Sequence, residues 1–243
     1  MNSNNLKIIA IITMIIDHIG YYFYYSLDAQ TVLTLRIIGR IAMPLFVFMI
    51  IEGYFYTKDF KKYILRLGIL AIITEFFIRI VMYVNYLKFP NYNIMNIMPY
   101  NIIFNFVILL IFIKFIDKIN IDNKIIDVVL KILVFVLLCI ILNYIDIDYN
   151  CYILIIGTTY FILKKLINKY NYSKIINLII LFIVFLTICV IKGNIYYFMM
   201  LSLLFIALYN GKLGKKSKVL RNLFYYIFPL QHIVLYLTAM LKY

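Results

Sequence analysis

Apolar residues form long runs along almost the entire chain, and short segments rich in Asn, Lys and Tyr separate them. The runs are close to the length of about 20 residues that an α-helix needs to cross a bilayer. The pattern predicts nine membrane-spanning helices, near residues 6–25, 33–54, 63–84, 101–116, 125–143, 150–166, 175–191, 195–209 and 222–241. We therefore expect an all-α, polytopic membrane bundle in which residues 1–243 form a single transmembrane domain.

The composition supports the membrane assignment. Hydrophobic residues make up 66% of the chain and charged residues 14%, whereas a soluble domain is usually about 45–50% apolar and about 25% charged. Cys139, Cys151 and Cys189 lie far apart and belong to no CxxC or Cys/His cluster, so the sequence indicates neither a metal site nor a disulfide framework. The first run lacks a small-residue cleavage site, and we interpret it as the first helix rather than a signal peptide.

The net charge of +14 would suggest a nucleic-acid partner in a soluble protein. Here the basic residues follow the predicted topology, because Lys and Arg collect in cytoplasmic loops. With a cytoplasmic N-terminus, the nine spans place 18 basic residues on the inner side and 4 on the outer side. We therefore predict an N-in, C-out orientation in a lipid bilayer, with no nucleic-acid partner.

The first predicted span contains an acid and a histidine next to each other, Asp17 and His18. A charged group in a bilayer costs about 2.5–3.5 kcal/mol on insertion scales, so it needs a partner. Adjacent residues point about 100° apart on a helix, so these two cannot form a dyad by themselves. His18 lies near the expected midplane and suits proton transfer, although a neutral, hydrogen-bonded histidine is the alternative. His232 is the second histidine, three residues after Pro229, which we expect to open or kink its helix.

Two arginines lie within the second predicted span. Arg36 and Arg40 are four residues apart, so they share one helix face and repel each other unless they meet carboxylates, carbonyls or an anionic ligand. Asp17, Glu75 and Asp148 have compatible depths. Structural pairing between helices is the alternative explanation for these charges, and Glu75 is also four residues before Arg79.

The segment YNGKLGKKSK at residues 209–218 carries two glycines and four lysines on the predicted inner side. Lysines and free backbone N–H groups are suited to hold phosphates. The alternative is that the segment is only a basic topology signal. The chain has no P-loop, dinucleotide-binding glycine pattern or GxSxG motif.

Two long stretches, LKIIAIITMIIDHIG at residues 6–20 and LRIIGRIAMPLFVFMIIEGYFYT at residues 35–57, resemble the TraX family. So do three shorter ones, DYNCY (148–152), YNGKLG (209–214) and YYIFPLQHIVLYL (225–237). More distantly, Lys7 leading to His18 and PLFVFMIIEG at 44–53 are similar to the membrane acyltransferases of acyltransferase family three. The chain departs from the TraX pattern at Asn150, where relatives have Gly, and in FPLQH, which has one residue more than YPxH. The second departure leaves the role of His232 open.

The resemblance implies an integral membrane acetyltransferase of the bacterial inner membrane. Its co-substrate would be acetyl-CoA, with no metal, and its acceptor an amine such as the N-terminus of a peptide or pilin in a conjugation system, or a hydroxyl of a glycan. His18 would be the general base, while Arg40 or Arg36 would orient a carboxylate or stabilise the oxyanion. The candidate catalytic residues are His18, Asp17, Arg40, Arg36, Glu75 and His232, and the candidate cofactor-binding residues are Tyr209, Asn210, Lys212, Lys215, Lys216, Arg221 and Glu52.

Two other function classes stay open at this point. Buried charges also form proton or ion paths, so a proton- or ion-coupled transporter is one alternative. Many transporters carry internal repeats, and none is visible in this sequence. The other alternative is a membrane interaction protein whose charges only hold helices together; it predicts that removing the His18 imidazole changes nothing.

Overall fold

The computed structural model describes residues 1–88, 99–170, 173–212, 214 and 218–240. Helices account for the secondary structure of these residues, apart from one isolated bridge between Tyr100 and Ile147. The prediction of an all-α chain is therefore confirmed. The elements are α1 (Ser3–Tyr22), α2 (Ala29–Gly39), α3 (Ala42–Tyr56), α4 (Phe60–Lys88), α5 (Ile102–Lys118), α6 (Lys124–Ile145), α7 (Tyr152–Tyr170), α8 (Lys174–Lys192), the 3-10 helix η2 (Asn194–Leu201), α9 (Ser202–Ala207) and α10 (Lys218–Met240).

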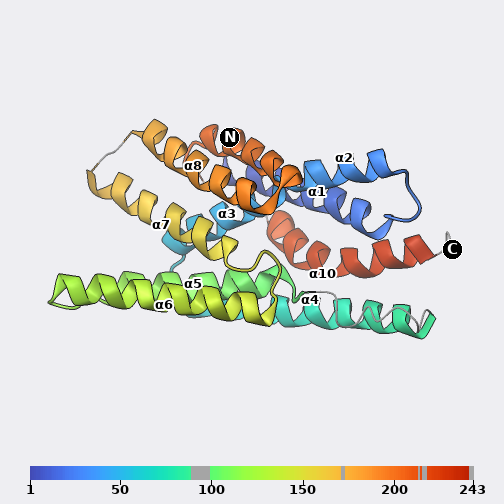
Figure 1. Ribbon diagram of the computed structural model, residues 1–243, viewed down its shortest axis with the longest axis horizontal. Coiled ribbons are helices and arrows are strands. Elements are labelled where there is room, and N and C mark those ends of the chain that lie inside the picture. Colours follow the sequence, from blue (N-terminus) through green and yellow to red (C-terminus); the bar gives the residue numbers. More distant parts are fainter. Residues whose placement is uncertain (89–98, 171–172, 213, 215–217, 241–243) are drawn as a thin grey trace.

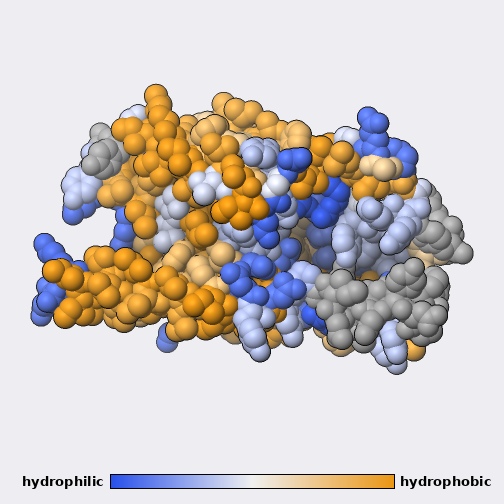
Figure 2. Space-filling view, in the orientation of Figure 1, coloured by the Kyte–Doolittle hydropathy of each residue, from blue (hydrophilic) through white to orange (hydrophobic). Residues whose placement is uncertain are grey.

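Among the described residues, four helical stretches are long and apolar enough to cross a membrane: Ala29–Tyr56, Phe60–Leu87, Lys124–Ile145 and Lys174–Lys192. Large apolar side chains are exposed along α6 and α8, which is typical of helices that face lipid. Figure 2 shows these apolar surfaces on either side of a hydrophilic area in the middle of the molecule. The protein is thus a helical membrane protein, while the count of nine spans and the N-in, C-out orientation stay predictions.

The second predicted span, 33–54, lies within the helical stretch Ala29–Tyr56, which is long and apolar enough to cross a membrane and which contains a break. The helix is interrupted at Arg40: α2 ends at Gly39 and α3 begins at Ala42. The backbone N–H of Arg40 bonds to the carbonyls of Ile37 and Ile38, so the last turn of α2 is tighter than an α-turn. Pro44 falls in the first turn of α3, where its missing N–H removes no helix hydrogen bond.

Two further expectations differ from the structure. The eighth predicted span, 195–209, is not a single α-helix, because η2 runs from Asn194 to Leu201 before the short α9. Gly193 precedes it with a φ of 99°, a conformation that favours glycine and separates η2 from α8. Pro229 does not open a helix, because α10 continues through it from Lys218 to Met240, while the kink expected there as the other possibility stays a prediction. The other seven predicted spans each correspond to one helix.

Helix α3 lies in the middle of the molecule and packs against α1, α5, α7 and α9. In Figure 1, α5 and α6 run side by side along one edge, and α1, α2, α4 and α10 extend toward the opposite end. The ends of α5 and α7 and the starts of α6 and α8 lie together on the left of the view and carry Lys118, Lys124, Lys169 and Lys174. We call this region the basic end.

Candidate functional site

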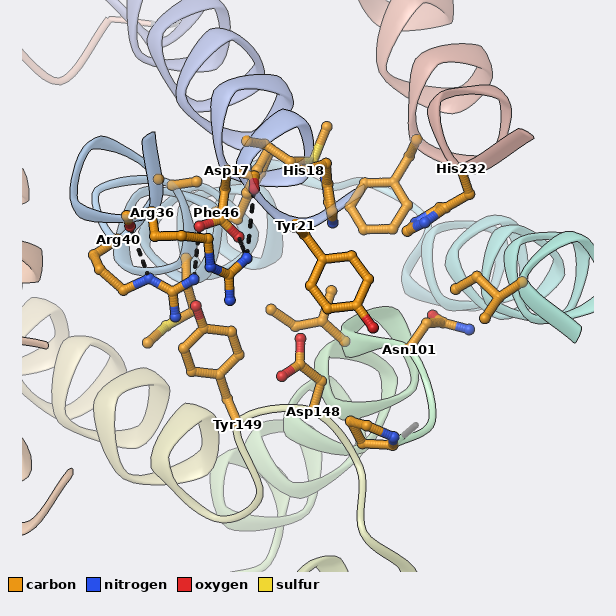
Figure 3. A pocket seen from close by; sticks show the side chains of 18 of the residues that line it. Asp17, His18, Tyr21, Arg36, Arg40, Phe46, Asn101, Asp148, Tyr149 and His232 are labelled. Carbon is orange, nitrogen blue, oxygen red and sulfur yellow. Dashed lines mark hydrogen bonds and ion pairs between the residues drawn. The ribbon is translucent and has the colours of Figure 1, made fainter. Parts of the chain in front are cut away.

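A cavity of about 230 Å³ lies where α1, α2, α3 and α10 meet the loops around residues 99–102 and 148–149. We call it the central cavity. Figure 3 shows two arginines on one side of it and a histidine pair toward the other, with Tyr21 and Asp148 between. The polar side chains that line it come from segments far apart in the sequence: Asp17, His18, Tyr21, Tyr22, Arg36, Arg40, Tyr100, Asn101, Asp148, Tyr149, Tyr196 and His232.

The carboxylate of Asp17 forms ion pairs with two arginines, Arg36 in α2 and Arg40 at the break between α2 and α3. Its Oδ2 lies 2.7 Å from a terminal guanidinium nitrogen of Arg36, and its Oδ1 lies 2.6 Å from one of Arg40. The Nε of Arg40 donates to the carbonyl of Arg36 at 3.2 Å. The close contact depends on Gly39, because a Cβ there would lie 2.2 Å from the Cβ of Asp17. Of the three kinds of partner expected for the arginine pair, the structure shows a carboxylate, that of Asp17, and backbone carbonyls.

Tyrosine rings cover the outer sides of both guanidinium groups. The Arg40 guanidinium lies 5.4 Å from the ring centre of Tyr196 and 5.8 Å from that of Tyr149. The Arg36 guanidinium lies 5.6 Å from the ring centre of Tyr21. Rings at these distances attract a cation through their quadrupole. Together with Asp17, the tyrosine rings hold both arginine side chains in place, and some of the guanidinium N–H donors stay unused.

His18 and His232 meet on the other side of the central cavity. Their ring centres are 4.9 Å apart with an interplanar angle of 67°. The hydroxyl of Tyr22 lies 2.8 Å from Nδ1 of His232. Nδ1 of His18 is buried and has no hydrogen-bond partner within the described residues. As expected from their spacing, Asp17 and His18 point to different neighbours, Asp17 to α2 and His18 to α10.

The loop before α7 supplies Asp148 and Tyr149, and its backbone is held in place at several points. The side-chain amide of Asn105 donates to the carbonyls of Asp148 and Asn150, at 3.1 and 2.6 Å. The N–H of Asp148 donates to the carbonyl of Tyr100 at 2.9 Å. Asn150 has a φ of 42°, a conformation that Asn adopts more readily than most residues.

Glu75 does not join the central cavity. It pairs with Arg79 at 2.6 Å and accepts from the backbone N–H and side-chain amide of Asn101, at 3.0 and 2.8 Å. Asn101 lines the central cavity, so the hydrogen bonds from Asn101 to Glu75 help to position part of the cavity wall. Of the six predicted catalytic residues, the structure brings His18, Asp17, Arg36, Arg40 and His232 together and leaves Glu75 in a structural pair.

A second cavity, of about 470 Å³, lies between α3, α7, α8, α9 and residues 209–211, closer to the basic end. We call it the inner cavity. Glu52 forms an ion pair there with Lys164 and accepts from the hydroxyl of Tyr209 at 3.1 Å. Lys174 donates to the carbonyl of Tyr209 at 2.8 Å and also to that of Ala207.

The predicted cofactor-binding residues are only partly gathered at this cavity. Glu52, Tyr209 and Asn210 line it. Lys212 is exposed, and its N–H donates to the side chain of Asn210 at 3.1 Å. Lys215, Lys216 and the side chain of Arg221 lie outside the described residues.

Several lining residues were not predicted. The sequence reasoning missed Tyr21, Tyr22, Asn101, Tyr149 and Tyr196 at the central cavity, and Lys164 and Lys174 at the inner one. The chain has 24 tyrosines, so a tyrosine by itself carries no signal for a site. A polar Asn101 at the start of an apolar run was a usable signal.

One family model matches nearly the whole chain. The family model described as "TraX protein" matches residues 2–239. A probable fimbrial assembly protein FimC of Dichelobacter nodosus is 37% identical over 70 residues, which are 29% of this chain and 28% of that protein. An uncharacterized protein of Rickettsia prowazekii is 49% identical over 70 residues, 28% of this chain and 25% of that protein. The chain thus matches about a quarter of the length of these relatives, and no solved structure matches it.

Proposed function

Because the chain belongs to the TraX family, we propose that it is an integral membrane acetyltransferase. It transfers the acetyl group of acetyl-CoA to an amine, such as a peptide or pilin N-terminus, or to a hydroxyl of a glycan. The name of the Dichelobacter nodosus relative, a probable fimbrial assembly protein, supports a role in pilus-related processes. We place the protein in the bacterial inner membrane with nine spans, the N-terminus inside and the C-terminus outside.

The observation that carries this proposal is the central cavity, which holds two imidazoles 4.9 Å apart and two guanidinium groups on one carboxylate. Acyl transfer from a thioester requires a base for the nucleophile and hydrogen-bond donors for the oxyanion. Two guanidinium groups have ten N–H donors between them. Asp17 and the Arg36 carbonyl use only some of these, so donors are left to face the substrate.

In the proposed reaction, His18 takes a proton from the acceptor nitrogen or oxygen as that atom attacks the thioester carbonyl. Arg36 or Arg40 donates hydrogen bonds to the tetrahedral oxyanion. When the carbon–sulfur bond breaks, the imidazolium of His18 returns its proton to the CoA sulfur. The acetyl group ends on the acceptor and CoA leaves as the thiol, so no covalent acyl-enzyme is needed.

Three neighbours have supporting roles in this scheme. Asp17 holds both guanidinium groups in place and balances part of their charge. Tyr22 orients the His232 ring through its contact with Nδ1, so that His232 supports or relays the proton of His18. Asp148 faces the cavity between the arginines and the histidines (Figure 3), where its carboxylate is suited to receive a hydrogen bond from the acceptor.

In this proposal acetyl-CoA approaches from the side of the inner cavity, and the acceptor enters the central cavity. The predicted orientation puts the inner cavity and the basic end on the cytoplasmic side, where acetyl-CoA is available. Lysines of the basic end attract its phosphates. The central cavity lies further from that end, so the acceptor enters from the opposite side.

The test is CoA release by the purified protein in nanodiscs with acetyl-CoA and a panel of peptide amines and sugar hydroxyls. We expect His18→Ala to keep its thermal unfolding temperature and to lose CoA release by a factor of about 10²–10⁴, since a general base contributes that much. His232→Ala is the matched control, because it removes an equal ring from the same cavity and is expected to cost less.

Each contrary result has a definite meaning. CoA release that survives His18→Ala and is lost in His232→Ala would assign the base to His232. A folded protein that binds no acetyl-CoA would contradict the acetyltransferase proposal. Ion or proton flux through the same preparation would then favour the transporter, whose buried charges the central cavity also provides.

A further inference from the structure

The inner cavity has the composition of a small-molecule site. Sites for organic ligands are mostly apolar concavities of about 300–1,000 Å³ with a few placed polar groups, and this one has a volume of about 470 Å³. Its polar lining consists of three side-chain amides (Asn168, Asn177 and Asn210), two phenols (Tyr160 and Tyr209), Lys174 and the Glu52–Lys164 pair. Its apolar lining consists of Phe48, Ile51, Leu163, Ile167, Leu178, Leu181 and Ile206.

One of the three side-chain amides has an unused donor. Asn177 on α8 is only 7% exposed, and its Nδ2 is buried without a hydrogen-bond partner in the described residues. A buried donor left unpaired costs about 1–3 kcal/mol. The side chain lines the inner cavity, so a bound molecule with a carbonyl oxygen would satisfy it. A purely hydrocarbon ligand would leave the donor unpaired.

Cationic groups lie at the same cavity. Lys174, at the first turn of α8, lines it and is held by the carbonyls of Ala207 and Tyr209. Lys164 lies above the rings of Phe55 and Tyr56, at 5.0 and 4.9 Å, while it pairs with Glu52. The matching ligand is therefore a chain with amide groups and apolar carbons that ends in a phosphate.

Helix α3 lies between the inner cavity and the central cavity. Phe46 of α3 lines the central cavity, and Phe48, two residues later on the same helix, lines the inner one. The ring of Phe48 packs edge-on against Tyr160 and Tyr209, with 5.3 Å between ring centres in both cases. Residues two positions apart point about 200° apart on a helix, so the two cavities contact nearly opposite faces of α3.

We propose that the inner cavity binds the pantetheine arm of the acyl donor. Asn177 donates to an amide carbonyl of the arm, the apolar walls contact its methyl groups, and Lys174 faces its phosphate end. This assignment rests on the proposed transfer of acetyl from acetyl-CoA. The assignment places the binding site for acetyl-CoA at residues other than the lysines of the 209–218 segment.

Two variants of α8 test the assignment, with equilibrium binding to the purified protein in nanodiscs as the readout. The ligands are acetyl-CoA, S-acetylpantetheine, which lacks the nucleotide, and adenosine 3′,5′-bisphosphate, which lacks the arm. Asn177→Leu removes the amide at nearly constant volume. It is expected to weaken both arm-bearing ligands five- to tenfold and to leave the nucleotide unchanged, as the loss of one hydrogen bond predicts.

Leu181→Trp fills the inner cavity and is expected to abolish binding of S-acetylpantetheine. Leu186→Trp is the matched control, since Leu186 lies on the same helix but is 38% exposed and does not line the cavity. Unchanged binding of arm-bearing ligands in both Asn177→Leu and Leu181→Trp would overturn the assignment.

The outcomes also separate this inference from the proposed function. Acetyl-CoA turnover that is insensitive to Asn177→Leu and Leu181→Trp would leave acetyl transfer standing and refute this donor site. Asn177-dependent binding of S-acetylpantetheine with no transfer to any acceptor would refute the acetyltransferase and leave a thioester site. A phospholipid that copurifies with the wild type, is lost in Leu181→Trp and is not displaced by acetyl-CoA would assign the cavity to lipid and overturn the proposal.

Discussion

Two arginine–carboxylate clusters lie within the helices of this protein and are built from the same residue types. In one, Asp17 of α1 binds Arg36 and Arg40, which come from α2 and the helix break. In the other, Glu75 binds Arg79 within α4 and accepts two hydrogen bonds from Asn101. Both contain an i,i+4 pair, but the charged side chains line the central cavity only in the first, whereas the second contributes Asn101 alone to the lining.

The difference lies in how many partners each charge has. Glu75 uses both oxygens on groups that hold α4 to the start of α5, so this cluster is a structural connection. In the Asp17 cluster, one carboxylate serves two cations, and the side chain of Arg40 is only 6% exposed. A buried excess of donors is unfavourable for stability alone. It is useful where a negative charge develops during a reaction.

The largest contrast is expected from replacing the arginines. Arg40→Lys should lower the rate of acetyl transfer by a factor of about 10²–10³, because Lys cannot keep the Asp17 contact and present further donors in a fixed plane. Arg79→Lys should change the rate less than threefold. CoA release at saturating acetyl-CoA measures both. Equal losses in the two variants would show that the clusters have the same role.

The carboxylates should differ in stability. Asp17→Asn leaves two guanidinium groups without a counter-charge and is expected to cost about 3–5 kcal/mol, as for a broken buried pair. Glu75→Gln should cost about 1–2 kcal/mol, because the amide still accepts from Asn101 and Arg79 is 32% exposed. Thermal unfolding in detergent gives the order, and a reversed order would contradict the difference in burial.

Each cluster has a glycine on one of its helices, and replacing these two glycines tests packing separately from charge. Gly39→Ala places a Cβ 2.2 Å from that of Asp17, so we expect lower stability and weaker activity. Gly68→Ala is the matched control on α4, where nothing lies within 4 Å, and it should be neutral or stabilise by about 0.5–1 kcal/mol. If Gly39→Ala keeps full activity, the close approach of α1 and α2 is not required for the Asp17 contacts.

The smallest effect is expected at Tyr22. Tyr22→Phe removes the hydroxyl 2.8 Å from Nδ1 of His232 and leaves the ring. If this contact orients the imidazole, the turnover rate should fall about three- to tenfold with no change in acetyl-CoA affinity, the size of one neutral hydrogen bond. Tyr21→Phe, which keeps the ring beside Arg36, is the control. Identical turnover in wild type and Tyr22→Phe would exclude a role of Tyr22 in orienting His232.

The sequence by itself determined the class of the protein and most of its helices. Apolar runs of span length predict helices because backbone groups in lipid must bond within their own segment. That argument located seven helices near their observed bounds. It also identified Asp17, His18, Arg36 and Arg40 as unusual, since a polar group in such a run needs a partner.

Only the tertiary structure decided which partners these groups have. Asp17, Glu75 and Asp148 were equally compatible with Arg36 and Arg40 by depth, and the choice of Asp17 depends on the close approach at Gly39. The break at Arg40 comes from a tightened turn that hydropathy does not register. His232 and Tyr149 reach the central cavity from segments more than one hundred residues away from His18. Sequence periodicity describes one helix at a time, whereas a site is made by the packing of several.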